Sequence, residues 1–274
     1  MAITASDVNK LRQTTGAGMM DCKNALVEAN GDFDMAIDIL RKKGQKVAAK
    51  RADRASNEGR TIAKANADNT FAAVLVVSCE TDFVGKNADF VTFAESIMDA
   101  AMQNSIKTRE ELLDLEINGR KVSDLLIDMT GKTGEKVELP EYNVIEAPTV
   151  AAYNHNGNRL ATILGLNLPG YEKIGHEIAM QIAAMNPIAV NQDSIPQSVI
   201  DHELEIARDI TRQEGKPEEM VEKIAMGKLN KFFKENTLLN QEFIMNNKIT
   251  VGDYLKQANK DLTCTGFFRL QLGA

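Results

Sequence analysis

The 274-residue chain has no tryptophan, only 5% aromatic residues, and just three cysteines and three histidines. Cys22, Cys79 and Cys264 stand far apart and form no Cys-x-x-Cys pair, which argues against a disulfide framework and against a zinc ribbon. The histidines form none of the short His/Glu runs of zinc enzymes. We therefore expect reduced thiols, no metal site and no cofactor.

Long apolar runs are also missing. No window approaches the roughly 18 uninterrupted apolar residues that cross a bilayer, and the first ten residues lack the basic-then-apolar order of a secretory signal. We therefore expect a cytoplasmic protein with no membrane partner. The net charge of −7 and the few aromatic rings suit neither phosphate neutralisation nor base stacking, so no specific nucleic-acid partner is expected.

Catalytic groups are scarce as well. Gly131-Lys132-Thr133 resembles the end of a phosphate-binding loop, but Leu126 stands where the first glycine of that loop is required. Cys79 could be a thiol nucleophile near a helix N-terminus, although no histidine is close in sequence; a buried structural cysteine is the alternative. With so few catalytic ingredients, the chain is expected not to be an enzyme and to act by contacting another protein.

The first 44 residues carry three apolar stripes with helical spacing. Ser6 is a candidate cap of the first helix, the second begins near Met19, and the third opens at Asp32 and is expected to end before Gly44. Three such helices can enclose a small common core. They predict a compact three-helix domain at the N-terminal end.

Residues 41–60 change character and are locally basic. Eight cationic residues face only two acids there, a local charge of +6: Arg41, Lys42, Lys43, Lys46, Lys50, Arg51, Arg54 and Arg60 against Asp53 and Glu58. Such a run is typical of a linker or a solvated helix face, and it can also contact RNA. Both interpretations are kept.

Two pairs of strand-like segments follow, each joined by a turn signal, at 61–65 with 71–77 and at 149–153 with 160–166. Amphipathic helices are expected after each pair, at 90–101 and 174–184. Residues 198–235 carry two helical stripes around the break Gly215-Lys216-Pro217, which predicts an antiparallel helical hairpin. Residues 266–270 are expected to form an apolar tail.

These patterns predict an α+β protein with an N-terminal three-helix domain, a two-part α+β core with antiparallel sheets, and an inserted helical hairpin. The expected divisions are a three-helix domain with its basic linker (1–54), a first core unit (55–140), a second core unit with a terminal module (141–190 and 236–274), and the hairpin (191–235).

Two motifs suggest contact surfaces. Met19 and Met20 follow Gly16-Ala17-Gly18, and we expect one of them to face outward as an adaptable apolar contact. Residues 80–85, Glu-Thr-Asp-Phe-Val-Gly, lie between a buried strand and a helix, where side chains project from a rigid frame. Phe83 can fill a partner's pocket there, while the Asp82 carboxylate competes for a cation or repels a phosphate.

Both motifs resemble the bacterial elongation factor Ts family. The first runs from Leu11 to Lys23, and the second is Cys79-Glu80-Thr81-Asp82-Phe83-Val84. Weaker similarity continues through residues 132–137, 153–164 and 227–241, so the resemblance covers essentially the whole chain. The chain differs from the family pattern at three positions, where Gly85 replaces a common Ala, Thr133 an Ile, and Glu242 a Pro.

The resemblance implies a guanine-nucleotide exchange factor that binds elongation factor Tu in its GDP-bound and nucleotide-free forms. It implies that the N-terminal domain is similar to a ubiquitin-associated domain and docks on the GTPase. It implies that a turn intrudes beside the magnesium and phosphates of the GTPase, and that residues 191–235 can form a homodimer contact. The partner-binding residues carried over are Met19, Met20, Thr81, Asp82, Phe83, Val84, Gly134, Glu135 and His155. The alternative is an RNA-binding translation accessory protein that uses residues 41–60.

Overall fold

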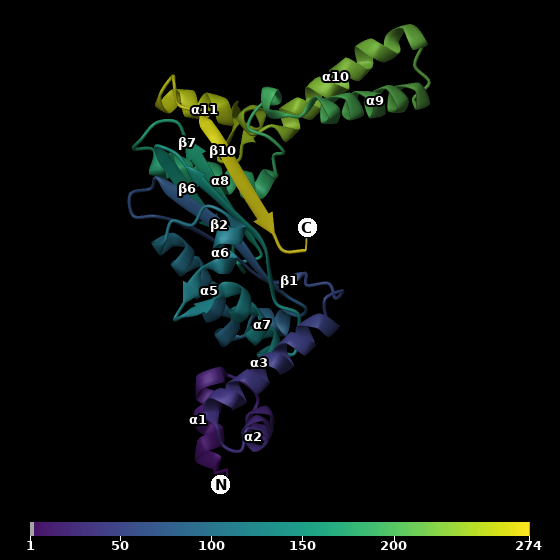
Figure 1. Ribbon diagram of the computed structural model, residues 1–274. Coiled ribbons are helices and arrows are strands. Elements are labelled where there is room, and N and C mark those ends of the chain that lie inside the picture. Colours follow the sequence, from purple (N-terminus) through teal and green to yellow (C-terminus); the bar gives the residue numbers. More distant parts are fainter. Residues whose placement is uncertain (1–2, 274) are drawn as a thin grey trace.

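The computed structural model describes residues 3–273 (Figure 1). The chain begins with α1 (Ala5–Thr15), α2 (Met19–Glu28) and α3 (Phe33–Lys50). Leu11, Leu26 and Ala36 are buried between these helices, which confirms the three apolar stripes as one small core. The cap of α1 is Thr4 and not Ser6, because the Thr4 hydroxyl accepts the amide of Asp7 and the Asp7 carboxylate accepts the amide of Thr4.

The third helix does not end before Gly44. It continues through that residue to Lys50, so the first half of the basic run is helical. Gly44 is buried because α3 crosses α7 (Val122–Thr133) there at close range. The glycine therefore allows two helices to approach and does not stop the helix, which the sequence pattern alone could not distinguish.

The first sheet has the strand order β1-β2-β5, with antiparallel pairing throughout. Its strands are β1 (Glu58–Ala65), β2 (Phe71–Cys79) and β5 (Glu138–Glu146). One face carries α5 (Ala88–Gln103), α7 and the short α6 (Arg109–Asp114), together with the hairpin of β3 (Glu116–Ile117) and β4 (Arg120–Lys121). The expected division at residue 140 falls inside β5, whose pairing with β2 keeps it in the first unit.

The second sheet has the order β10-β7-β6 and is again antiparallel. Its strands are β6 (Thr149–Asn154), β7 (Leu160–Leu166) and β10 (Cys264–Gln271). The segment expected to be an apolar tail is therefore the edge strand β10. Its partner β7 is a hundred residues earlier in the chain, so no local turn signal marks the pairing.

Helices and short elements cover the outer face of this second sheet. They are α8 (Glu172–Met185), η2 (Leu238–Asn240), β8 (Glu242–Phe243), β9 (Asn246–Thr250) and α11 (Val251–Ala258). The inner faces of the two sheets pack together through small and branched residues such as Val74, Val150 and Ile163. The core is thus layered helix, sheet, sheet, helix, and β2 is buried on both of its faces.

The predicted hairpin is confirmed as α9 (Gln197–Gln213) and α10 (Glu218–Asn236), preceded by the short turn η1 (Gln192–Ser194). It projects from the body at the end opposite the three-helix domain (Figure 1). At its base the outgoing and returning chains are bridged, Ala189 to Thr237, and the amide of Ile188 donates to the carbonyl of Asn236 at 2.9 Å. Within residues 3–273, no helix combines the length and apolar content needed to span a bilayer.

Candidate functional site

The turn that follows β2 presents the most exposed aromatic side chain of the described residues. Thr81 caps the single-turn helix α4 (Asp82–Gly85), and its hydroxyl accepts the amide of Val84 at 3.5 Å. Phe83 is 84% exposed, whereas Val84 packs against the first core. The Asp82 carboxylate accepts a hydrogen bond from Lys86 at 2.6 Å. The turn therefore holds an aromatic ring in solvent beside a carboxylate, as the sequence predicts.

Two glycines allow this turn to lie directly on the sheet. A Cβ added to Gly85 would be 3.0 Å from the amide nitrogen of Gly59 on β1. Gly59 itself has a φ of +127°, and a Cβ there would be 2.2 Å from the carbonyl of Val77. The glycine at position 85 therefore fits a backbone contact that an alanine could make only if α4 moved by a few tenths of an ångström.

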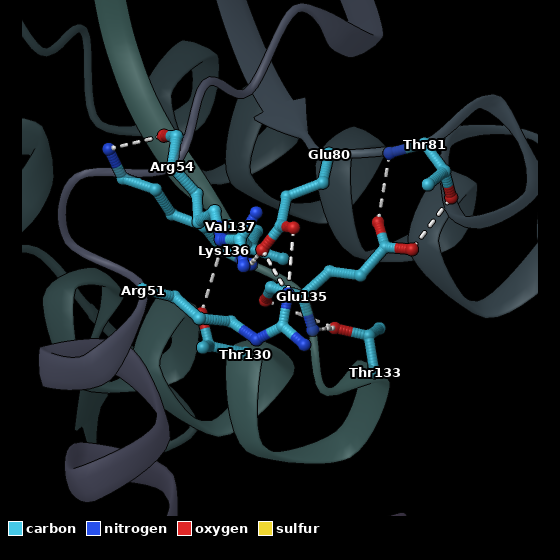
Figure 2. Close-up of polar contacts among 9 residues, drawn as sticks. All are labelled: Arg51, Arg54, Glu80, Thr81, Thr130, Thr133, Glu135, Lys136 and Val137. Atoms are coloured by element: carbon cyan, nitrogen blue, oxygen red, sulfur yellow. Dashed lines mark hydrogen bonds and ion pairs between the residues drawn. The ribbon is translucent and has the colours of Figure 1, made fainter.

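Glu135 lies against the same turn, and Gly134 directs the chain there. Gly134 has a φ of +73° and ends α7, so the chain reverses and brings Glu135 toward Thr81. The Glu135 carboxylate accepts the Thr81 amide at 3.0 Å and the Thr81 hydroxyl at 2.7 Å (Figure 2). The structure thus brings together two motifs that are 54 residues apart in sequence.

A second carboxylate, that of Glu80, completes this arrangement. It accepts the Lys136 amide at 2.7 Å and the Arg51 guanidinium at 2.7 Å (Figure 2). Partial burial acts to raise the pKa of Glu80, but these hydrogen bonds outweigh it and hold that pKa below its ordinary value of 4.5. Sequence reasoning did not select Glu80, Arg51 or Lys136 as site residues. The position of Glu80 inside the second motif was the available signal.

Thr133 has a local role beside Glu135. Its hydroxyl donates to the carbonyl of Met129 at 2.8 Å and accepts the Glu135 amide at 3.2 Å. Two residues after Glu135, the amide of Val137 donates to the hydroxyl of Thr130 at 3.1 Å. The last turn of α7 therefore fixes the backbone that carries Glu135. Gly131, Lys132 and Thr133 form the C-terminal turn of α7, whereas the same residues of a phosphate-binding loop lie at a helix N-terminus, so they form no such loop.

His155 lies in the exposed turn between β6 and β7, and its Nδ1 is 2.9 Å from the hydroxyl of Tyr153. The same turn is tied to β1, because the Thr61 amide donates to the carbonyl of Asn158 at 2.8 Å and Arg159 pairs with Glu58. Glu58 is the strand partner of Cys79, at the end of β2 from which the Thr81 turn departs. His155 therefore lies at the same end of the sheets as the exposed phenylalanine.

Met19 and Met20 begin α2 in the three-helix domain, and both face solvent, with 58% and 63% of their surfaces exposed. The sequence analysis expected only one of them to do so. The second can be exposed because Cys22, Ala25 and Leu26 supply the whole inward stripe of this helix. The domain therefore presents an apolar pair at the α1–α2 turn.

Half of the basic run is neutralised within the molecule. Four of its eight cations form ion pairs: Arg41 with Asp38, Lys43 with Asp21, Arg51 with Glu80, and Arg60 with Glu95. Lys42, Lys46 and Lys50 follow one another at one-turn spacing along α3 and face solvent. In the part of the chain that the structure describes, no cluster of three or more His, Cys, Asp or Glu side chains is placed to hold a metal ion.

The chain is similar over its whole length to known proteins of one family. The model of a family described as "Elongation factor TS" matches residues 80–274. A protein named "Elongation factor Ts" from Christiangramia forsetii is 52% identical over 273 residues, covering 99% of both chains. Proteins of the same name from Flavobacterium psychrophilum and Porphyromonas gingivalis are 50% and 48% identical over 273 and 275 residues, covering 99% and 100% of both chains.

Proposed function

The chain belongs to the elongation factor Ts family of translation elongation factors, and on that premise we propose that it is a guanine-nucleotide exchange factor for elongation factor Tu. It binds the GDP-bound GTPase, disturbs the magnesium and phosphate site, releases GDP and so allows GTP to bind. It makes and breaks no covalent bond and needs no cofactor. It acts in the cytoplasm, where elongation takes place.

The observation that carries this proposal is the 84% exposure of Phe83 on a turn whose backbone is held at both ends, by Glu135 and by Gly59. Binding immobilises an exposed ring and the chain that carries it, which costs conformational entropy. A backbone that is already fixed lowers this cost. The ring enters an apolar pocket of the GTPase and displaces side chains near the metal. Thr81 and Val84 hold the turn in place on either side of the Asp82-Phe83 pair.

Asp82 adds an electrostatic element. The hydrogen bond from Lys86 holds the pKa of Asp82 below its ordinary value, so the carboxylate is charged at neutral pH. A negative charge beside the bound nucleotide competes for magnesium and repels the phosphates. Linkage is reciprocal: the ratio by which the exchange protein lowers the affinity of the GTPase for GDP equals the ratio by which GDP lowers its affinity for the exchange protein.

The remaining predicted residues extend the contact surface. We propose that Met19 and Met20 dock the three-helix domain on the GTPase, that Gly134 and His155 line the contact around the Phe83 turn, and that Glu135 supports this turn from within the molecule. The methionine pair then supplies most of the affinity for the GTPase, and the Phe83 turn causes the release of GDP. The two functions can be separated by measuring the half-saturating concentration and the maximal release rate.

We also propose that the hairpin allows two copies to associate. Val199, Ile206 and Ile210 lie on one side of α9 at helical spacing and are exposed, beside the buried seam with α10. Ile206→Glu should shift a dimer to a monomer in sedimentation, while a monomeric wild-type protein at micromolar concentration would contradict this.

The exchange function is tested by mixing the factor with elongation factor Tu that carries a fluorescent GDP. We expect Asp82→Ala combined with Phe83→Ala to slow release at saturating factor by about a hundredfold, in line with the loss of two central contacts. Glu141→Ala is a matched control, because Glu141 is exposed on β5, where it pairs with Val76 and not with the residues of the turn. Release at the wild-type rate by the double variant would overturn the proposed mechanism.

The row of Lys42, Lys46 and Lys50 favours one alternative function, RNA binding. That function predicts association with RNA that weakens steeply as salt rises, whereas exchange predicts capture of nucleotide-free elongation factor Tu that GDP reverses. Changing the three lysines to glutamine should leave GDP release unaltered under our proposal and should abolish RNA retention under the alternative.

A further inference from the structure

The segments 80–81 and 135–136 hold each other by a reciprocal exchange of hydrogen bonds, which we call the carboxylate clasp. Glu80 accepts the amide of Lys136, the residue directly after Glu135, and Glu135 accepts the amide of Thr81, the residue directly after Glu80. We propose that Glu80 and Glu135 are positioning residues, which fix the Thr81–Phe83 turn before it meets the GTPase. This inference rests on the proposed exchange function.

The orientation of Glu135 separates this role from a contact role. Both of its carboxylate oxygens are used within the molecule, Oε2 by the Thr81 amide at 3.0 Å and Oε1 by the Thr81 hydroxyl at 2.7 Å (Figure 2). The side chain is half-buried and turned toward the sheet end. A partner that bound this carboxylate would have to compete with hydrogen bonds already formed to a charged acceptor.

The clasp fixes the position of the Phe83 turn, which side-chain packing does not fix at this site. Phe83 contributes little to the core because it is 84% exposed, and α4 is only one turn long. A single turn of helix is marginal by itself, so its position depends on its attachments. The clasp fixes the backbone at the start of α4, and the Gly85–Gly59 contact fixes its end.

The clasp is also tied to the three-helix domain. Arg51 lies at the C-terminal end of α3, and one of its guanidinium nitrogens is 2.7 Å from each oxygen of Glu80. Glu80 is only 15% exposed at its side chain, so water screens this pair less than it screens the other pairs of the basic run. The docking domain and the Phe83 turn therefore meet at one carboxylate.

The first test uses the free factor and does not depend on the GTPase. Hydrogen exchange of the amides of Thr81 and Lys136 should accelerate at least about tenfold in Glu135→Ala and in Glu80→Ala, because each variant removes an acceptor. Glu141→Ala should leave both amides at their wild-type rates. Unchanged exchange at Thr81 in Glu135→Ala would overturn the clasp itself, whatever the function of the protein.

The second test is a double-mutant cycle on GDP release from elongation factor Tu. If Glu135 acts through the turn, Glu135→Ala should lower the maximal release rate about tenfold in the wild-type background and by less than about twofold in the Phe83→Ala background. The half-saturating concentration should stay within about twofold. Additive losses, or a raised half-saturating concentration with an unchanged maximal rate, would assign Glu135 to a direct contact and overturn the positioning role.

A conservative variant guards against simple misfolding. Glu135→Gln keeps the shape and one acceptor for the Thr81 amide, so it should restore most of the release rate and most of the exchange protection lost in Glu135→Ala. No rescue by Glu135→Gln, with the rest of the chain protected as in wild type, would contradict the clasp. If Phe83→Ala alone releases GDP at the wild-type rate, the proposed role of the ring fails. If the wild-type factor does not accelerate GDP release, the proposed function fails. In both cases the hydrogen-exchange result still decides the clasp.

Discussion

Gly44 of α3 and Gly131 of α7 lie directly against each other where the three-helix domain meets the core. A Cβ added to Gly131 would be 3.0 Å from the Cα of Gly44, and one added to Gly44 would be 3.2 Å from the carbonyl of Ile127. Each helix presents a glycine at the crossing, so the two backbones are in contact. This crossing sets where the domain that carries Met19 and Met20 stands relative to the Phe83 turn.

Replacement of Gly131 by valine should separate the two helices. Three extra carbons at a backbone contact cannot be absorbed by rotation of a neighbouring side chain, so we expect a loss of about 1–3 kcal/mol in the free energy of unfolding, measured by urea titration. Gly227→Ala on α10 is the matched control, because nothing lies within 4 Å of a Cβ there. The control should stabilise by about 0.4–1 kcal/mol. Equal effects of both variants would contradict the close crossing.

Replacement of Met19 and Met20 by serine should weaken docking without slowing the exchange step. We expect the half-saturating concentration of the factor to rise about tenfold and the maximal GDP release rate to stay within about twofold, because apolar anchors at an interface contribute mainly affinity. Both side chains are more than half exposed, so the melting temperature should hardly change. Met226→Ser on the hairpin is the control. A fall in the maximal rate alone would contradict this division of roles.

Acidification should release the clasp. The pKa of Glu80 is lower in the folded protein than its ordinary value of 4.5, so its hydrogen bonds contribute stability above that value, and the contribution is lost as the pH falls through the lowered pKa. Glu80→Gln has no proton to gain at this position. The unfolding free energy of the wild type should therefore fall more steeply than that of Glu80→Gln below pH 4.5, in parallel urea titrations. Parallel slopes would contradict the assignment.

Cys79 should be chemically inert. Burial, followed by the nearby Glu135 carboxylate, raises the pKa of the Cys79 thiol to about 12, and its sulfur is 3.2 Å from the carbonyl of Thr81, to which it donates. We expect no reaction with a thiol-specific chromogenic reagent at pH 8 until the chain unfolds, because only about one thiol in ten thousand is ionised there. Cys79→Ser should release GDP within about twofold of the wild type. Loss of activity in that variant would favour the thiol enzyme.

Local patterns predicted most of the helices and strands, because apolar spacing and turn residues act over a few neighbours. The pairs β1–β2 and β6–β7 follow directly from their turns. Strand β10 was missed because its partner β7 is far away in sequence, and α7 was not identified as a helix. The extension of α3 was missed because a glycine that permits close packing resembles a glycine that stops a helix.

The candidate site divides in the same way. Thr81, Asp82, Phe83 and Val84 are contiguous, so the sequence places them together, and the exposure of Phe83 agrees with its position after a buried strand. The pairing of Glu135 with Thr81 spans 54 residues and depends on the reversal of the chain at Gly134. Rules based on neighbouring residues cannot predict a contact over this separation. The resemblance selected Glu135, but only the structure shows which way its carboxylate points.

The bridge between Ala189 and Thr237 makes the α9–α10 hairpin a removable module. The chain leaves and re-enters the core at neighbouring positions that are already hydrogen-bonded to each other. An insertion that starts and ends at neighbouring, bridged positions can change in length or be lost while the second sheet keeps its strand pairing. The arm can therefore change its length and its partner independently of the machinery around Phe83.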